Sequence, residues 1–323
     1  MDNLNKKLNY FSIGGLTEPE NRPNNTKLCP HWVSGFSDAE SSFSIRITRD
    51  KNRKTGWRVL PIFTIELNNR DILLLKRVRD FFGVGSITER KNGKVVYYVQ
   101  SFANLTEVII PHFNRYSLLT KKRGDFILFT YIIGLLNSKE QATSVGLQKI
   151  INIRASMNQG LSSNLKIVFP NTNPIARPII NFQGIPHPNW LVGFIDGEGC
   201  FYVSTRKNKS KLDVGMIFSI SQHSRDHLLT SKIISYFNCG IIEKPKGRFE
   251  VRFVVYKFKD IFVKILPFLK KYPLQGVKNA DLLDFIKIAN LMKDKSHLTL
   301  EGLNKIRLLK AGMNKGRVHL NNN

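Results

Sequence analysis

Two stretches of the sequence decide the fold: HWVSGFSDAE at residues 31–40 and NWLVGFIDGE at residues 189–198. Their tryptophan, glycine, phenylalanine, aspartate and glutamate residues coincide when one stretch is laid over the other. Further identities follow in the same order and pair Phe63 with Phe218, Arg70 and Asp71 with Arg225 and Asp226, Pro111 with Pro267, Lys122 with Lys278, and Met157 and Asn158 with Met313 and Asn314. Chance similarity rarely keeps its register for about 130 residues, so the chain contains two copies of one domain.

The repeat sets the expected domain organisation. We expect a polar leader at 1–28, a first repeat at 29–160, a linker at 161–186 and a second repeat at 187–323. The predicted linker contains Pro170, Pro174 and Pro178 and has no hydrophobic periodicity, which is typical of a connecting segment.

Each copy follows one pattern of secondary structure. Pro30 or Pro188 suits the first turn of a short helix, at 32–39 or 190–197. Strict alternation then predicts a strand that buries Phe43, Ile45 and Ile47. The other predicted elements are a basic turn at 50–56, a helix at 70–82, hairpin turns at 92–93 and 245–247, and closing helices at 104–136, 140–156, 258–292 and 298–312. The order is helix, two strands, helix, two strands and helices, read twice.

Composition narrows the class of protein. The 323 residues include 50 Lys and Arg against 24 Asp and Glu, a net charge of +26, which favours a nucleic acid or another anionic partner. With 42% hydrophobic residues the chain has material for a core, which argues against disorder. The longest apolar run, 126–136, is shorter than the roughly 20 residues of a membrane span. The three cysteines form no CxxC pair, which argues against a disulfide framework or zinc ribbon.

The repeated helices carry a face of small residues that ends in an acid. Gly35 and Ala39 are four residues apart, as are Gly193 and Gly197, so two backbones can approach closely. Such a face also suits packing under the helix's own sheet, but the duplication favours a pseudo-two-fold contact between the copies. The terminal acids, Glu40 and Glu198, are disfavoured there by the helix dipole. Held together, they would repel unless divalent cations, Mg²⁺ above all, lay between them.

These residues resemble the LAGLIDADG homing endonucleases, in the single-chain form with two motif copies. The stretches GEGCF at 197–201 and MNKGR at 313–317 are similar to the group encoded in fungal mitochondrial introns. The resemblance implies an α+β fold of two αββαββα units with saddle-shaped antiparallel sheets, packed through the motif helices. It implies a monomeric, mitochondrial, magnesium-dependent enzyme, with Ca²⁺ or Mn²⁺ as substitutes, that cuts both strands of a long asymmetric DNA site and leaves short 3′ overhangs.

The resemblance also assigns residues to the metal site and to catalysis. The metal site is expected to comprise Glu40, Glu198, Ser41 and Gly197, where Ser41 departs from the usual glycine and its Cβ is expected to shift the local carbonyl geometry. Gln222, Lys122 and Lys278 are expected to position water and steady charge. Leu67 stands where Gln222 stands in the second copy, so the two cutting sites are expected to be inequivalent. Asp38 and Asp196 match a motif aspartate that is usually structural.

The predicted hairpins carry the residues expected to contact DNA. Base edges are expected to meet strand residues that alternate with the buried set, and phosphates to meet lysines near the turns. The expected DNA-binding residues are Ser44, Arg46, Thr48, Arg49, Lys51, Arg53, Arg58, Arg90, Lys94, Tyr98, Gln100, Tyr202, Ser204, Arg206, Lys207, Lys209, Lys244, Lys246, Arg248 and Arg252.

Two alternative functions fit the same composition. A maturase would use this scaffold to bind intron RNA and assist splicing, and a basic architectural protein would bind nucleic acid without chemistry. Both motif acids are retained, which favours cleavage. None of the seven histidines has the spacing of an HNH or zinc site, and no membrane partner is expected.

Overall fold

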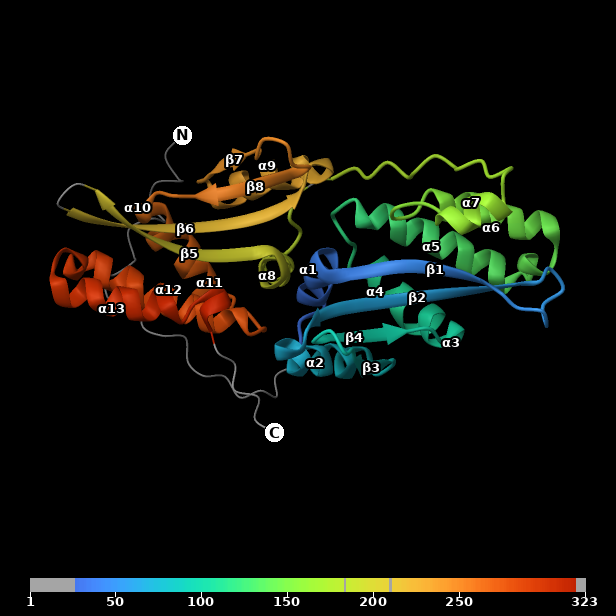
Figure 1. The fold of residues 1–323 in the computed structure, drawn as a ribbon, viewed down its shortest axis with the longest axis horizontal. Coiled ribbons are helices and arrows are strands. Elements are labelled where there is room, and N and C mark those ends of the chain that lie inside the picture. Colours follow the sequence, from blue (N-terminus) through green and yellow to red (C-terminus); the bar gives the residue numbers. More distant parts are fainter. Residues whose placement is uncertain (1–26, 183, 209–210, 318–323) are drawn as a thin grey trace, which may run out of the picture.

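The computed structural model describes residues 27–182, 184–208 and 211–317, which form two halves built alike (Figure 1). The first half contains α1 (Pro30–Glu40), β1 (Ser41–Arg49), β2 (Trp57–Asn68), α2 (Ile72–Phe82), β3 (Ser86–Glu89), β4 (Lys94–Val99), α3 (Phe102–Asn104), α4 (Ile110–Arg115), α5 (Lys122–Asn137), α6 (Ser144–Ala155) and α7 (Ser163–Val168). The second half contains α8 (Pro188–Glu198), β5 (Gly199–Asn208), β6 (Lys211–His223), α9 (His227–Phe237), β7 (Ile241–Glu243), β8 (Glu250–Val255), α10 (Phe258–Asp260), α11 (Leu266–Lys271), α12 (Lys278–Lys293) and α13 (Leu300–Ala311). The predicted fold class is confirmed.

Each half has one four-stranded antiparallel sheet. The strand orders are β1-β2-β4-β3 and β5-β6-β8-β7, the same order in both copies. Phe43, Ile45 and Ile47 of β1 are buried as predicted, because they face the helices of their half. The residues between them belong to the opposite face of the sheet, which the helices leave open.

Helices α1 and α8 lie side by side at the centre of the molecule (Figure 1). A Cβ built on Gly35 would lie 1.9 Å from the carbonyl oxygen of Trp190, and one built on Gly193 would lie 2.1 Å from that of Trp32. Only glycine permits backbones this close. The predicted pseudo-two-fold contact through the small helix faces is therefore confirmed.

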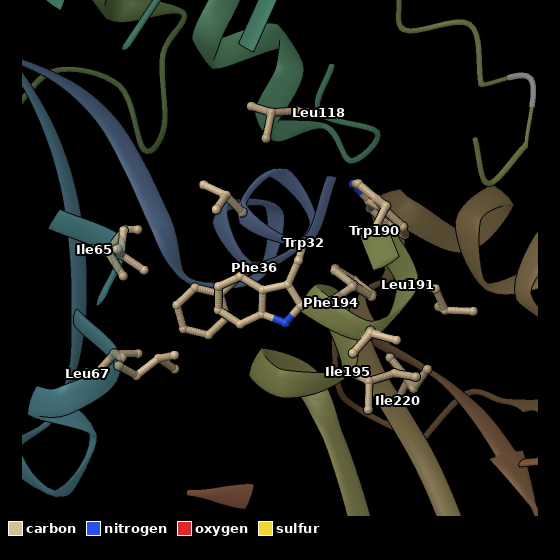
Figure 2. Close-up of a cluster of buried hydrophobic side chains, with 14 of the residues drawn as sticks. Trp32, Phe36, Ile65, Leu67, Leu118, Trp190, Leu191, Phe194, Ile195 and Ile220 are labelled. Carbon is tan, nitrogen blue, oxygen red and sulfur yellow. The ribbon is translucent and has the colours of Figure 1, made fainter. Parts of the chain in front are cut away.

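One hydrophobic core runs through both halves. Figure 2 shows Trp32 and Phe36 of α1 beside Phe194 of α8, with Leu67 of β2 on one side and Ile220 of β6 on the other. Because the central helices contribute to one shared core, the two halves are fixed relative to each other through buried side chains.

Two predicted helices are each interrupted in the structure. The helix expected at 104–136 breaks between α4 and α5, and the one expected at 258–292 breaks between α11 and α12. The first break exists because Asp38 accepts hydrogen bonds from the backbone N–H groups of Leu119 (2.7 Å) and Thr120 (3.2 Å), which draws these groups out of a helix. A π-helical turn precedes α4 and also α11, beside Pro111 and Pro267, where each proline lacks the N–H that an α-helix needs.

The segment that joins the halves packs on the first half. It begins with α7 and then runs extended back to the centre (Figure 1). Phe169 packs on Trp57 with ring centroids 5.1 Å apart, and Arg177 pairs with the buried carboxylate of Asp125 at 3.0 Å. No described helix combines the length and hydropathy required to cross a membrane. Residues 1–26 of the predicted leader lie outside the described residues.

Candidate active site and nucleic-acid interface

The two motif glutamates lie together at one end of the α1 and α8 pair. Each is the last residue of its helix and is half-buried. A carboxylate oxygen of Glu40 lies 3.2 Å from the position of a Cβ built on Gly197, the residue before Glu198. Burial raises the pKa of Glu198 to about 7, and the neighbouring charge of Glu40 adds to this shift. Burial also raises the pKa of Glu40. The site therefore holds two carboxylates whose negative charges repel each other.

One glutamate has a side-chain partner that the other lacks. The Gln222 amide donates a hydrogen bond from Nε2 to Oε1 of Glu198 at 3.0 Å. Leu67 occupies the corresponding place in the first sheet, since Leu67 pairs with Val95 as Gln222 pairs with Val251. Leucine has no donor, so the surroundings of the two acids differ as expected.

Two lysines hold the carboxyl ends of the motif helices. The ammonium group of Lys122 donates to the carbonyls of Ser37 (2.9 Å) and Ala39 (3.2 Å), and that of Lys278 donates to Ile195 (3.2 Å) and Gly197 (2.7 Å).

The negative end of each helix dipole lies at these carbonyls and disfavours the glutamate there. The lysine ammonium groups offset this negative charge. Burial lowers the pKa of Lys122 to about 8, although the charges of Asp38 and Glu40 raise it. Burial also lowers the pKa of Lys278. Each lysine is therefore a partly desolvated cation next to the acid pair.

The motif aspartates brace the interface. The indole N–H of Trp32 donates to Asp196 at 2.8 Å, and that of Trp190 donates to Asp38 at 3.1 Å. Burial raises the pKa of both aspartates to about 6, against the effect of the backbone donors and, for Asp196, of the Trp32 indole. Their carboxylates lie in the interface, and their oxygens accept hydrogen bonds from several donors. These aspartates therefore have a structural role.

Ser41 does not shift the backbone as its Cβ suggested. Its φ and ψ are −88° and 166°, close to −72° and 148° at Gly199. Its hydroxyl donates to the Ser37 carbonyl at 2.7 Å. A Cβ on Gly199 would instead lie 2.6 Å from the side chain of Ile195. The same Cβ would also lie 2.6 Å from the Ile195 carbonyl oxygen. Ser37, which stands where Ile195 stands in α8, therefore relieves only the side-chain contact.

The donor set decides whether a cation fits this site. No cluster of three or more His, Cys, Asp and Glu side chains occurs within the described ranges. The Gly197 carbonyl already accepts from Lys278, and the Ser41 hydroxyl is turned to Ser37. The side-chain atoms that remain as metal ligands are the carboxylate oxygens of Glu40 and Glu198, which suit hard divalent cations. Beside Glu40 a cavity of about 760 Å³ opens between the two halves.

The open faces of the two sheets carry most of the predicted DNA-binding residues. Strand pairing sets Thr48 opposite Arg58 on the first sheet and Arg252 opposite Ser221 on the second. By alternation the open faces include Ser44, Arg46, Thr48, Arg58, Lys94, Tyr98, Gln100, Tyr202, Ser204 and Arg252, and the turns include Lys51, Arg53, Arg90, Lys244, Lys246 and Arg248. Because these residues come from both halves, they form two basic surfaces that flank the acid pair.

Arg49 lies apart from this set. Its guanidinium lies 4.1 Å from the ring centroid of Trp57, on the helix-covered face by alternation. Acidic neighbours also hold some of the arginines, since Arg90 pairs with Glu66 at 2.7 Å and Arg252 with Glu250 at 2.6 Å. Lys209 lies outside the described residues, as do the side chains of Arg206 and Lys207.

Three comparisons with known proteins agree with this architecture. The sequence model of the family described as LAGLIDADG endonuclease matches residues 33–133 and 191–289. Probable intron-encoded endonuclease 2 of Neurospora crassa is 38% identical over 88% of this chain and 65% of its own length. Probable intron-encoded endonuclease 3 of the same fungus is 41% identical over 88% of this chain and 55% of its own length. The chain therefore spans less than two thirds of these curated relatives.

A solved structure covers more of its own chain. The crystal structure of the I-SmaMI LAGLIDADG homing endonuclease bound to cleaved DNA is 44% identical, covers 91% of this chain and 99% of that one, and superposes with a TM-score of 0.89. Another structure holds I-SmaMI with an uncleaved DNA target in the presence of calcium ions. The shared fold therefore includes both repeats.

Proposed function

The chain belongs to the LAGLIDADG endonuclease family, and from this membership we propose that it is a site-specific DNA endonuclease. It cuts both strands of a long, asymmetric duplex and leaves short 3′ overhangs. The observation that carries the proposal is the pair of half-buried glutamates at the adjoining ends of α1 and α8, between two basic sheet faces. A basic protein that only binds nucleic acid has no need for two opposed carboxylates at that point.

The acid pair supports a requirement for Mg²⁺, with Ca²⁺ or Mn²⁺ as substitutes. Glu40 and Glu198 would hold the metal, since two like charges in a partly desolvated place are stabilised by a cation between them. The raised pKa of Glu198, about 7, is the expected signature of such a site before a cation binds. A metal held by these two carboxylates would supply positive charge to offset the negative charge that develops during phosphodiester hydrolysis.

The surrounding residues orient the acids and balance charge. Gln222 orients one carboxylate oxygen of Glu198 through its 3.0 Å hydrogen bond. The other oxygen of Glu198 then remains available to bind the metal. Lys122 and Lys278 keep their ammonium groups at the helix ends, where they stabilise the negative charge that develops on a phosphate above the acid pair. Because Leu67 replaces Gln222 in the first half, the two strands are cut at different rates.

The sheet faces supply affinity and sequence recognition. Arginines and polar side chains on the strands read base edges in the major groove, and lysines in the turns bind phosphates. The first and second faces differ in sequence, so the target is only weakly palindromic. The pseudo-two-fold axis lies within one chain, so we propose that a monomer is active. Its intron-encoded relatives in a fungus support a mitochondrial location.

The test is cleavage by purified protein and by its glutamate variants. The target is recovered by cleavage selection from a randomised duplex library, or taken as the joined exons if the gene lies in an intron. We expect Glu40→Gln and Glu198→Gln to bind this duplex with unchanged affinity and to lose double-strand cutting with Mg²⁺. Glu107→Gln, at an exposed position, is the matched control. Cutting by both active-site variants would refute the proposal, and binding of intron RNA without DNA cleavage would favour a maturase.

A further inference from the structure

We propose that Asp226 and Asp71 are positioning residues that each hold an active-site lysine of the opposite half. This inference rests on the proposed function only for the role of the lysines. It begins from the Arg-Asp pair at residues 70–71 and 225–226, which repeats in both copies and has no part in the site described so far.

The backbone before each lysine is held by carboxylates. In the loop before α5, Leu119 and Thr120 donate their N–H groups to Asp38. The next N–H, that of Lys121, donates to Asp226 at 2.7 Å. Asp226 lies in the turn before α9, so this bond crosses from the second half to the first. Lys122, the first residue of α5, follows at once.

The second half repeats this arrangement. Gln275 and Gly276 donate their N–H groups to Asp196 at 2.8 and 3.1 Å. The next N–H, that of Val277, donates to Asp71 of the first half at 3.4 Å, and Lys278 then begins α12. The same order of acceptors occurs in both copies. The two crossing bonds are therefore a repeated feature of the fold and not an accident of packing in one half.

These bonds help to hold the starts of α5 and α12, whose N-cap residues Lys121 and Val277 provide no side-chain cap. At α5 the Thr120 hydroxyl also accepts the N–H of Lys122 at 3.2 Å. A free N–H at a helix start is satisfied by a carboxylate, which also complements the helix dipole. Because Lys122 reaches the carbonyls of Ser37 and Ala39 from this first turn, a movement of the turn moves its ammonium group. Asp226 therefore couples the placement of Lys122 to the packing of the two halves.

Asp226 contacts the backbone N–H of Lys121, next to Lys122. It is absent from the charges that shift the pKa of Lys122, which are those of Asp38, Glu40, Glu198 and Asp125. It is also buried, with 7% of its surface exposed. An asparagine would keep an oxygen acceptor for the Lys121 N–H, whereas an alanine would not. Asp71 differs, because its charge raises the pKa of Glu40, and its crossing bond is longer.

The test measures the lysine and the cleavage separately. Competitive acetylation of the full chain over a range of pH, read by mass spectrometry, gives the pKa of the Lys122 amine whether or not the protein cuts DNA. We expect Asp226→Ala to raise this pKa from about 8 toward the ordinary lysine value of about 10.4, and Asp226→Asn to leave it unchanged. Asp80→Ala, which removes an exposed aspartate from α2, is the control.

Strand-resolved cleavage of the selected duplex completes the experiment. We expect Asp226→Ala to slow one strand cut roughly tenfold or more at unchanged DNA affinity, as a small misplacement of a catalytic group does, and Asp226→Asn to cut normally. An unchanged Lys122 pKa in a folded Asp226→Ala protein would overturn the inference. If that variant does not fold, strand-resolved cleavage by Asp71→Ala decides, with normal cutting of both strands refuting the inference. A shifted pKa with normal cutting would support the positioning role and refute the proposed role of the lysine.

Discussion

Substitution of Gly35 by alanine tests the contact between the central helices most directly. The added Cβ would lie 1.9 Å from the Trp190 carbonyl oxygen, whereas real Cβ atoms essentially never come within 3.0 Å of such an atom. Helices α1 and α8 must therefore separate by about 1 Å. That movement would stretch the bonds from Trp32 to Asp196 (2.8 Å) and from Trp190 to Asp38 (3.1 Å) beyond hydrogen-bonding distance.

The expected loss of stability follows from these contacts. Overpacking costs about 1–3 kcal/mol, and each weakened bond to a buried carboxylate costs about 1.5–3 kcal/mol. We expect Gly35→Ala to lower the free energy of unfolding by about 4 kcal/mol or more, or the melting temperature by roughly 8 °C for a chain of this size. Circular dichroism during thermal and urea unfolding measures both.

A second glycine provides the matched control for this prediction. Gly134 lies within α5 and has nothing within 4 Å of an added Cβ, so Gly134→Ala should stabilise the protein by about 0.4–1 kcal/mol. If Gly35→Ala were as stable as the wild type, the close helix contact and the pseudo-two-fold axis built on it would be refuted.

Three further outcomes follow from the site. Trp190→Phe removes a donor to buried Asp38 and should cost about 1.5–3 kcal/mol, more at pH 8 than at pH 5 in urea unfolding, because the carboxylate is charged at the higher pH. Burial raises the folded pKa of Glu198 from 4.5 to about 7, so its contribution to stability is complete below about pH 4.5 and is lost as the pH rises through 7. Without divalent cations, the free energy of unfolding of Glu198→Gln should therefore exceed that of the wild type by up to about 3 kcal/mol at pH 8 and equal it at pH 4. The reverse order would contradict the raised pKa of Glu198. Leu67→Gln should bring the rates of the two strand cuts closer together in a gel assay with each strand labelled, and unequal rates that do not change would argue against a role for Gln222.

The central architecture was predictable because it depends on repetition. Gly35 and Gly193 stand at the same point of two copies, and this duplication favours a contact between the copies over packing of each helix under its own sheet. Strand alternation placed Phe43 and its neighbours correctly, since burial on one face of a sheet leaves a period of two in the sequence. Both the repeat and the alternation can be recognised in the sequence itself, without knowledge of which residues are in contact.

The features that the sequence did not reveal depend on partners far along the chain. The break before α5 arises because Asp38, 81 residues before Leu119, accepts its N–H, and the local sequence does not identify so distant a partner. The exchange of tryptophan and aspartate partners between the halves joins Trp32 to Asp196 across 164 residues. Arg49 is a separate case, because its partner Trp57 is near in the sequence and alternation from Ile47 already assigns Arg49 to the helix-covered face.

Several differences between the copies lie away from the pseudo-two-fold contact, although that contact itself sets Ala39 against Gly197. Groups on the axis keep their chemistry in both halves, because each glycine, tryptophan and aspartate of one copy contacts the other copy. Gln222 bonds the glutamate of its own half, Leu67 holds the corresponding place in the first sheet, and the Ser41 hydroxyl bonds Ser37 of its own helix. A fused pair can therefore diverge on the surfaces that would meet an asymmetric duplex, whereas a change on the axis must be compatible with both copies at once.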